Sequence, residues 1–306
     1  DYKGEFSDIQ NNHWLSLFDV DRSCILDPLT QPLPFTPFKD FTGRSINEIN
    51  LYSTEMSSAL CSIDRVSASA NMNNRLSEAI VEAYKSTNGA PISFELMLKC
   101  YQSRMKDANN DDSISSVLKQ LVNAHIFESE DKVSLIDDSY IIKMDGYPKD
   151  GPIAKAIVYF LMSKLNNIYE LLDKQAVNDE VVQIRHFSII DEAHYMLDFD
   201  NRPLRNLIAV GRNKGLSIIL ATQNMSSFKS KGFDFYANAQ YPLIMKQQTI
   251  DDKVIKDLFG VSGQELQEIR TAIAGLQKGE LIIKDQMAFA LGMGNKYKKI
   301  NVTHLI

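Results

Sequence analysis

The spacing of apolar and polar positions along this 306-residue chain changes twice. From about Gly43 to Phe127 the apolar residues recur every three or four positions, the spacing of helices with one buried face. On either side of that stretch, short apolar runs of strand length alternate with loops or helical patterns. The pattern predicts an α/β chain in which residues 1–42 and 139–306 build one core and residues 43–138 form an inserted helical subdomain.

Individual elements follow from the same spacing. Helices are predicted over residues 74–85, 93–106, 113–125, 152–173, 251–259 and 263–273. Strands are predicted over residues 140–144 and 241–245, with a closing pair of strands over 280–291. The segment with Pro28, Pro32, Pro34 and Pro37 is too rich in proline for regular structure.

Two further apolar runs end abruptly in polar residues. The first is His186-Phe-Ser-Ile-Ile-Asp191-Glu192-Ala-His194, and the second is Leu216-Ser-Ile-Ile-Leu-Ala-Thr222-Gln223-Asn224. A helix-like segment with a glycine-containing exit lies between them, so the three segments read as a β-α-β unit. Since parallel strands end at the same edge of a sheet, Asp191, Glu192, Thr222 and Gln223 are expected to lie at that edge.

An acidic pair beside a polar pair suits the hydrolysis of a nucleoside triphosphate. Asp191 is the candidate Mg²⁺ ligand, acting through the water shell of the ion, and Glu192 the candidate base that orients and deprotonates the attacking water. Gln223, with Thr222 beside it, is placed to contact that water or the γ-phosphate. A simpler reading of the two acids is a helix N-terminus, where negative charge is favourable. The matching polar run after the second strand favours the ATPase interpretation.

These motifs resemble the HerA/FtsK superfamily of hexameric DNA-pumping ATPases. The resemblance rests on Ile189-Ile190-Asp191-Glu192-Ala193-His194, Gly211-Arg-Asn-Lys-Gly215, Leu220-Ala221-Thr222-Gln223, Asp1-Tyr-Lys-Gly4-Glu5-Phe6, Pro32-Leu-Pro34-Phe35-Thr-Pro37-Phe38 and Lys278-Gly279-Glu280. The overall arrangement is most similar to the DptH type, a component of restriction systems tied to DNA phosphorothioation. The resemblance implies a RecA-like, mainly parallel sheet flanked by helices, ATP and Mg²⁺ as cofactors, and a homo-oligomer, expected to be a hexameric ring. DNA and other subunits of a restriction or nuclease complex are the implied partners.

A ring would need an arginine that reaches a neighbouring subunit's nucleotide. Arg212 is our candidate for that catalytic role, with Arg205 and Arg202 as competitors. Arg212 also fits a structural role as a cation at a helix C-terminus before Gly215, and the sequence does not choose between these roles. His194 is interpreted as a hydrogen-bonded structural residue rather than a metal ligand.

The sequence departs from the superfamily in one important respect. It contains no Gly-x-x-x-x-Gly-Lys-Ser/Thr loop, whose backbone amides cradle phosphates, and no initiator methionine. We therefore expect the chain to be the carboxyl-terminal part of a longer protein that binds nucleotide poorly by itself.

The composition of the chain bears on its cellular location and its partners. No run of eighteen apolar residues occurs, no signal-peptide pattern is present, and Cys24, Cys61 and Cys100 form neither an even set nor a metal-type pair. These features predict a cytoplasmic protein with no membrane partner. The net charge of -6 means that any DNA contact must come from local basic groups.

Three functions remain open at this point. The first is an ATP-driven DNA translocase or remodelling ATPase of a restriction or processing complex, with Glu192, Gln223 and Asp191 as its machinery. The second is a non-hydrolysing assembly module that keeps the fold. The third is a conjugation or secretion ATPase of the same superfamily, whose cargo would be protein or single-stranded DNA.

Overall fold

The chain folds into two compact units. A computed structural model describes residues 1–8, 22–63, 68–106, 111–178, 181–197, 199–230, 233–292 and 296–302. The first unit comprises Asp1–Asp191 and Asp198–Ile219, and the second comprises Glu192–Leu197 and Leu220–Ile306.

The first unit contains helices, short strands and 3-10 turns. Its elements are η2 (Arg22–Cys24), β1 (Ile25–Leu26), α1 (Ile46–Ile63), α2 (Ala70–Ser86), α3 (Phe94–Gln102), α4 (Ser113–Ala124), β2 (Ile141–Ile142), α5 (Pro152–Leu171), β3 (Val177–Asn178), β4 (Val181–Val182), β5 (His186–Ile190), α7 (Arg202–Val210), η3 (Gly211–Lys214) and β6 (Leu216–Leu220, whose last residue belongs to the second unit).

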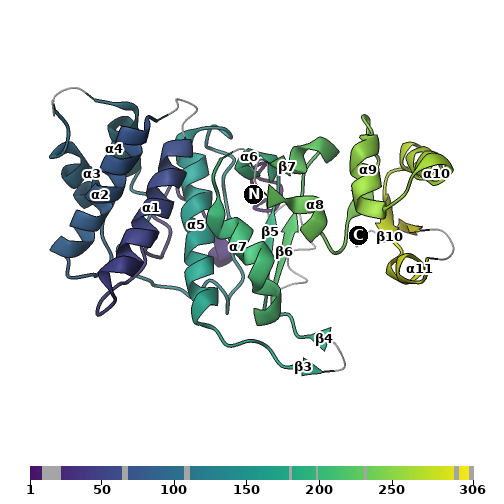
Figure 1. Ribbon diagram of the computed structural model, residues 1–306, viewed down its shortest axis with the longest axis horizontal. Coiled ribbons are helices and arrows are strands. Elements are labelled where there is room, and N and C mark those ends of the chain that lie inside the picture. Colours follow the sequence, from purple (N-terminus) through teal and green to yellow (C-terminus); the bar gives the residue numbers. More distant parts are fainter. Residues whose placement is uncertain are drawn as a thin grey trace. The chain divides into compact units, whose positions relative to one another are not determined.

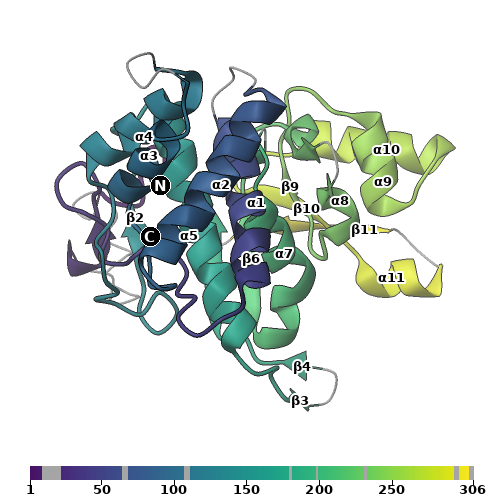
Figure 2. The same ribbon diagram turned by 60° about the vertical axis from the view of Figure 1, so that its left-hand side comes forward.

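The helices of the first unit form one connected layer. α1 packs on α2, α2 on α3 and α3 on α4, while α1 and α4 both contact α5, as Figures 1 and 2 show. Side chains cap the N-termini of three of these helices. The hydroxyls of Ser69 and Ser93 accept hydrogen bonds from the first turns of α2 and α3, and Asp112 forms a capping box with Ser115 at α4. The predicted helices over 74–85, 93–106, 113–125 and 152–173 are confirmed, with ends that differ by a few residues.

The proline-rich segment is irregular, as predicted, yet it packs firmly into the core. Its Phe38 ring lies 4.9 Å from the Phe94 ring of α3 and 5.6 Å from the Phe160 ring of α5. Leu33, which is fully buried, donates a backbone hydrogen bond to Ile126. Apolar side chains therefore join this segment to the helices without regular backbone pairing.

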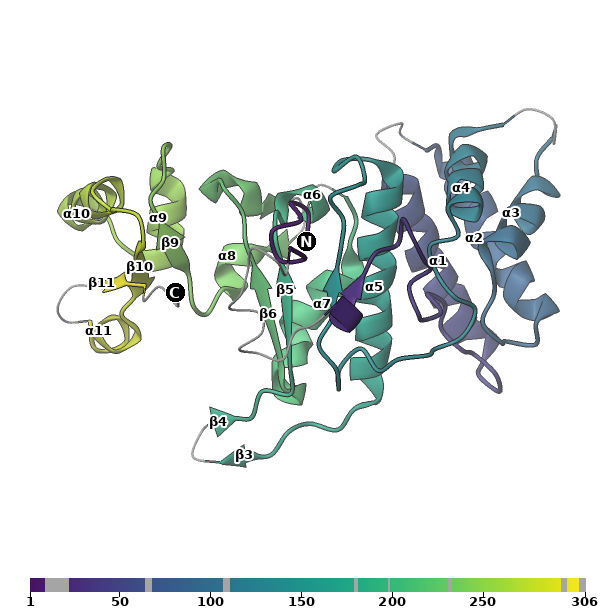
Figure 3. The ribbon, with the colours of Figure 1, turned by 180° about the vertical axis from the view of Figure 1, so that it is seen from behind.

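β5 and β6 form a parallel pair. At one end the backbone N–H groups of Arg185 and His186 donate to the Gly215 carbonyl, and at the other end the Ala193 N–H donates to the Ala221 carbonyl. Residue numbers rise in the same direction along both strands, which is the parallel arrangement predicted for the β-α-β unit. α7 connects the strands and lies between them and α5 (Figures 1 and 3).

The second unit is built on an antiparallel sheet. Its elements are α6 (His194–Leu197), η4 (Met225–Phe228), β7 (Lys229–Ser230), β8 (Phe233–Asp234), α8 (Phe235–Asn238), β9 (Leu243–Met245), α9 (Asp252–Phe259), α10 (Gly263–Ala274), β10 (Glu280–Lys284), α11 (Gln286–Leu291) and β11 (Tyr297–Asn301). β10 lies between β9 and β11. Val254, Phe259, Ile273 and Ile282 are fully buried in the core between this sheet and the helices α9 and α10.

One predicted element is wrong. Residues 280–291 were expected to form two closing strands, but only β10 is a strand, α11 follows it, and the second strand is β11. The Asp285 carboxylate accepts the backbone N–H of Ala288, which is a helix-capping contact. The Gln-Met-Ala-Phe-Ala-Leu run that follows is rich in good helix formers.

No helix in the described ranges is both long enough and apolar enough to cross a bilayer.

Gly215 should be needed for the approach of β6 to β5. It adopts a φ of +83°, and a Cβ there would lie 2.8 Å from the Gln183 carbonyl oxygen and 3.0 Å from the Arg185 nitrogen. We expect Gly215→Ala to lower the free energy of unfolding by about 1–3 kcal/mol beyond the cost of its backbone conformation. Gly43→Ala is the matched control, because Gly43 has a φ of +73° with nothing within 4 Å of its Cβ. Urea denaturation of both variants tests this, and equal losses would contradict it.

Candidate functional site

The turn after β5 presents Glu192 in an unusual backbone conformation. Its φ is +49°, in the left-handed region that L-residues other than glycine rarely adopt. The turn is closed by hydrogen bonds from the Tyr195 N–H to the Glu192 carbonyl and from the Met196 N–H to the Ala193 carbonyl. A strained residue of this kind costs about 1–3 kcal/mol and persists only when its surroundings hold it. Here the short helix α6 and the neighbouring strand do so.

Four polar side chains meet at the tips of β5 and β6. The Gln223 Nε2 donates a hydrogen bond of 2.6 Å to Glu192 Oε1. The His194 Nδ1 lies 3.3 Å from Glu192 Oε2 and 3.3 Å from the Thr222 hydroxyl oxygen. All four residues belong to the second unit.

The Glu192 carboxylate is almost completely enclosed. Its residue is only 3% exposed, whereas Gln223 is exposed to solvent. A carboxylate accepts hydrogen bonds and cannot donate them, so the amide nitrogen of Gln223 must be the atom that faces it. Such a charge-assisted bond offsets part of the cost of burying the charge.

His194 completes this arrangement. Its Nδ1 forms a hydrogen bond of 3.3 Å with the Thr222 hydroxyl, and it also lies 3.3 Å from Glu192 Oε2. The centroid of the ring lies 4.1 Å from that of Tyr195, with the two planes tilted by 38°. The sequence analysis interpreted His194 as a hydrogen-bonded structural residue and did not predict its contact with Glu192. The available signal was that His194 follows Glu192 by two residues.

The other predicted site residues lie in the first unit. Asp191 is half-buried and directly precedes Glu192 in the chain. Arg212 is exposed in η3. Its competitors are engaged, because Arg202 pairs with Glu55 at 2.9 Å and Arg205 forms an ion pair with Asp200. The catalytic roles of Glu192, Gln223 and Arg212, and the binding roles of Asp191 and Thr222, stay predictions.

The residues at these strand tips fit the cofactors that the sequence implies. Mg²⁺ prefers oxygen ligands and keeps several waters, so one protein carboxylate together with phosphate oxygens is sufficient. The Asp191 carboxylate of the first unit and the Thr222 hydroxyl of the second unit are each oxygen ligands of the kind that Mg²⁺ prefers. Among the described residues there is no cluster of three or more His, Cys, Asp or Glu side chains that would hold a metal by itself.

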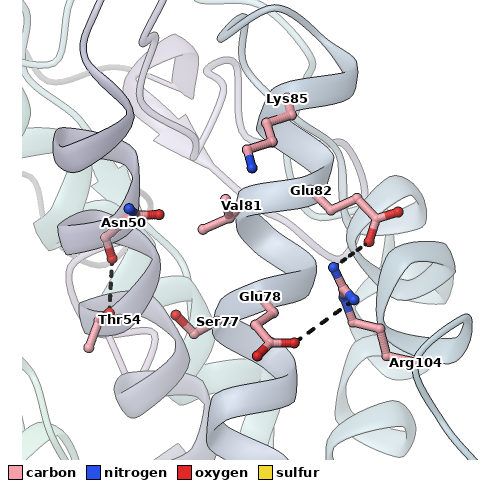
Figure 4. Close-up of a pocket in the computed structure, with 8 residues that line it drawn as sticks. All are labelled: Asn50, Thr54, Ser77, Glu78, Val81, Glu82, Lys85 and Arg104. Atoms are coloured by element: carbon pink, nitrogen blue, oxygen red, sulfur yellow. Dashed lines mark hydrogen bonds and ion pairs between the residues drawn. The ribbon is translucent and has the colours of Figure 1, made fainter.

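A separate pocket of about 430 Å³ opens in the helical layer of the first unit (Figure 4). It is lined by Asn50, Thr54, Ser77, Glu78, Val81, Glu82, Lys85 and Arg104. The Arg104 guanidinium lies 2.8 Å from the Glu82 carboxylate and 3.9 Å from that of Glu78, so charges on its wall neutralise each other. None of the predicted site residues lines it, and we place the candidate site at the strand tips.

Solved structures share this fold. VirB4 of Thermoanaerobacter pseudethanolicus matches with a TM-score of 0.63 and 15% identity, covering 97% of this chain and 80% of that chain. The bacterial conjugative coupling protein TrwBdeltaN70, with sulphate, matches with a TM-score of 0.51 and 13% identity over 92% of this chain and 74% of that chain. The plasmid coupling protein TrwB in complex with the non-hydrolysable ATP analogue ADPNP matches with a TM-score of 0.50 and 14% identity over 91% and 73%.

Sequence comparison gives no match. No protein-family profile matches the chain, and no curated protein matches it. The likeness in structure confirms the predicted α/β architecture, with the fold of RecA-like P-loop ATPases. The narrower resemblance to the DptH type gains no support from these neighbours.

His186, at the start of β5, should make the protein acid-sensitive. Burial lowers the pKa of His186, so the folded state resists a proton that the unfolded chain accepts near its ordinary value of about 6.5. The contribution of neutral His186 to the free energy of unfolding is therefore fully present above that value, and it is lost as the pH falls through it and below. We expect His186→Gln to lose less free energy of unfolding than the unchanged protein between about pH 7.5 and about pH 5.5. Urea denaturation at both pH values measures this, with exposed His125→Asn as control; equal losses in all three proteins would contradict it.

Proposed function

We propose that this protein is the hydrolysing and sensing part of a motor ATPase of the conjugation and secretion type. The observation that carries the proposal is the buried Glu192 carboxylate, held by Gln223 of the adjacent strand tip at 2.6 Å. An acid after one strand and an amide after its parallel neighbour can supply the base and the water- or phosphate-contacting group that ATP hydrolysis uses. The ADPNP bound to TrwB supports a nucleotide as the ligand.

Each side chain then has one task. Glu192 takes the proton of the attacking water, and Gln223 hydrogen-bonds the water or the terminal phosphate. Asp191 and Thr222 hold the metal–nucleotide, in which Mg²⁺ neutralises charge on the phosphates. The sequence has no glycine-rich phosphate loop, so we propose that residues outside these 306 bind the phosphates.

The cargo and assembly belong to the same proposal. VirB4 and TrwB are conjugation and secretion ATPases of the FtsK/HerA-like superfamily, which favours protein or DNA transport over a restriction complex. We propose that copies of the chain assemble into a ring, and that residues 43–138 are an insertion on its ATPase core. A non-hydrolysing assembly module is the competing function, and the next experiment separates the two.

Loss of the Glu192 carboxylate should abolish hydrolysis. In the protein expressed from its complete reading frame, Glu192→Gln is expected to lower the rate of ATP hydrolysis by about 10²–10⁴-fold, the usual contribution of a general base. Glu268→Gln, on an exposed part of α10, is the matched control and should keep full activity. Phosphate release with and without double-stranded DNA measures both. If the unchanged protein neither binds nor hydrolyses ATP, the assembly module takes the place of the motor.

Arg212 should act on the nucleotide of a neighbouring copy. Arg212→Ala alone and Glu192→Gln alone are expected to be inactive, because every site lacks one group. In a mixed ring, some sites combine the intact Glu192 of one copy with the intact Arg212 of the next, so mixing the two variants should restore part of the hydrolysis. Arg202→Ala, whose arginine pairs with Glu55, should retain activity and serves as control. A mixture as inactive as its components would contradict a role in trans.

A further inference from the structure

We propose that Gln223 is a latch: it holds Glu192 in the nucleotide-free protein and releases it when its amide turns to the terminal phosphate of a nucleoside triphosphate. This inference rests on the proposed function, and it concerns the control of the same site. It gives Gln223 a role before the chemical step, in addition to sensing the phosphate.

The Glu192 carboxylate is enclosed by the protein. A general base must come within hydrogen-bond reach of the water that it deprotonates. Glu192 is 3% exposed, and the Gln223 amide covers its Oε1 at 2.6 Å. In this arrangement the carboxylate is held by the protein, so catalysis requires it to move.

Gln223 and Glu192 differ in their exposure to solvent. Gln223 is exposed and Glu192 is buried, so a nucleotide arriving from solvent reaches the amide before the carboxylate. Carboxylate and phosphate oxygens both accept hydrogen bonds and compete for the same NH₂ group. If one amide bound both, the two anions would lie about 5 Å apart in a poorly solvated site, which is unfavourable. Exchange of the amide from one anion to the other avoids this repulsion.

The backbone of Glu192 is strained. It is left-handed, with φ of +49°, and the side chain of the same residue is held by the Gln223 bond. Loss of that bond removes a restraint on the strained residue and favours its movement. His194 is hydrogen-bonded to the Thr222 hydroxyl and lies 3.3 Å from Glu192 Oε2, so its ring adjoins the carboxylate.

Thermal unfolding of the nucleotide-free protein tests the bond itself. Four proteins are compared: the unchanged protein, Gln223→Ala, Glu192→Ala and the double variant. Gln223→Ala is expected to lower the Tm by about 2–4 °C when Glu192 is present, because a buried charge loses its donor, and by clearly less when Glu192 is absent. Equal shifts in both backgrounds would overturn the latch.

Affinity for a non-hydrolysable ATP analogue tests the exchange. Glu192→Gln and Glu192→Ala both remove the negative charge, but only Glu192→Ala also removes the acceptor that Gln223 holds. We therefore expect Glu192→Ala to bind the analogue about 5-fold more tightly than Glu192→Gln, the worth of one neutral hydrogen bond. The difference should disappear in the Gln223→Ala background, and also with ADP, which lacks the terminal phosphate.

The outcomes separate the latch from the proposed function. Equal affinities of the Gln and Ala variants for the analogue would overturn the latch and leave the ATPase proposal intact. If no variant binds nucleotide while thermal unfolding still couples Glu192 to Gln223, the proposed function fails, and the latch fails with it because the bond is then purely structural. Both measurements use the protein expressed from its complete reading frame.

Discussion

Parallel pairing of β5 with β6 is the constraint on which the candidate site depends. α7 carries the chain back between the two strands, so both strands end at the same edge and their terminal polar residues become neighbours. A shift of one residue in either strand would turn Glu192 or Gln223 toward the opposite face. Gly215 permits the register, because its positive φ and missing Cβ let the start of β6 approach Gln183 and Arg185.

The same pairing stabilises Glu192, whose burial and backbone conformation are both unfavourable. A carboxylate that is 3% exposed would be strongly unfavourable without donors, and a left-handed backbone adds strain. The Gln223 amide offsets part of the first cost, and the hydrogen bonds of the turn hold the left-handed conformation in place. Costs of this kind are commonly retained at functional sites, where an ordinary turn sequence with glycine would be more stable.

Much of this arrangement was predictable from sequence, because apolar spacing and strand-end polarity are local signals. They located the strands around Glu192 and Gln223 and most of the helices. They failed at residues 286–291, where a short apolar run fits a strand or a helix equally well and the Asp285 cap decides. The contact of His194 with Thr222 and the ion pair of Arg202 with Glu55 join residues that are distant in sequence, so no local pattern reveals them.

Basic residues in a sequence do not by themselves identify a cargo, because the structure decides whether they are already paired with acids. Lys296, Lys298 and Lys299 lie close together in the sequence, and they pair with Glu265, Asp285 and Glu280 at 3.3, 2.9 and 2.7 Å. Exposed pairs of this kind contribute only about 0–1 kcal/mol each, but they cancel the local positive field that would attract nucleic acid. Since the whole chain carries a net charge of -6, nucleic-acid binding by this strand would have to displace the three carboxylates first. The nucleotide chemistry therefore has a stronger physical basis in this molecule than any particular cargo.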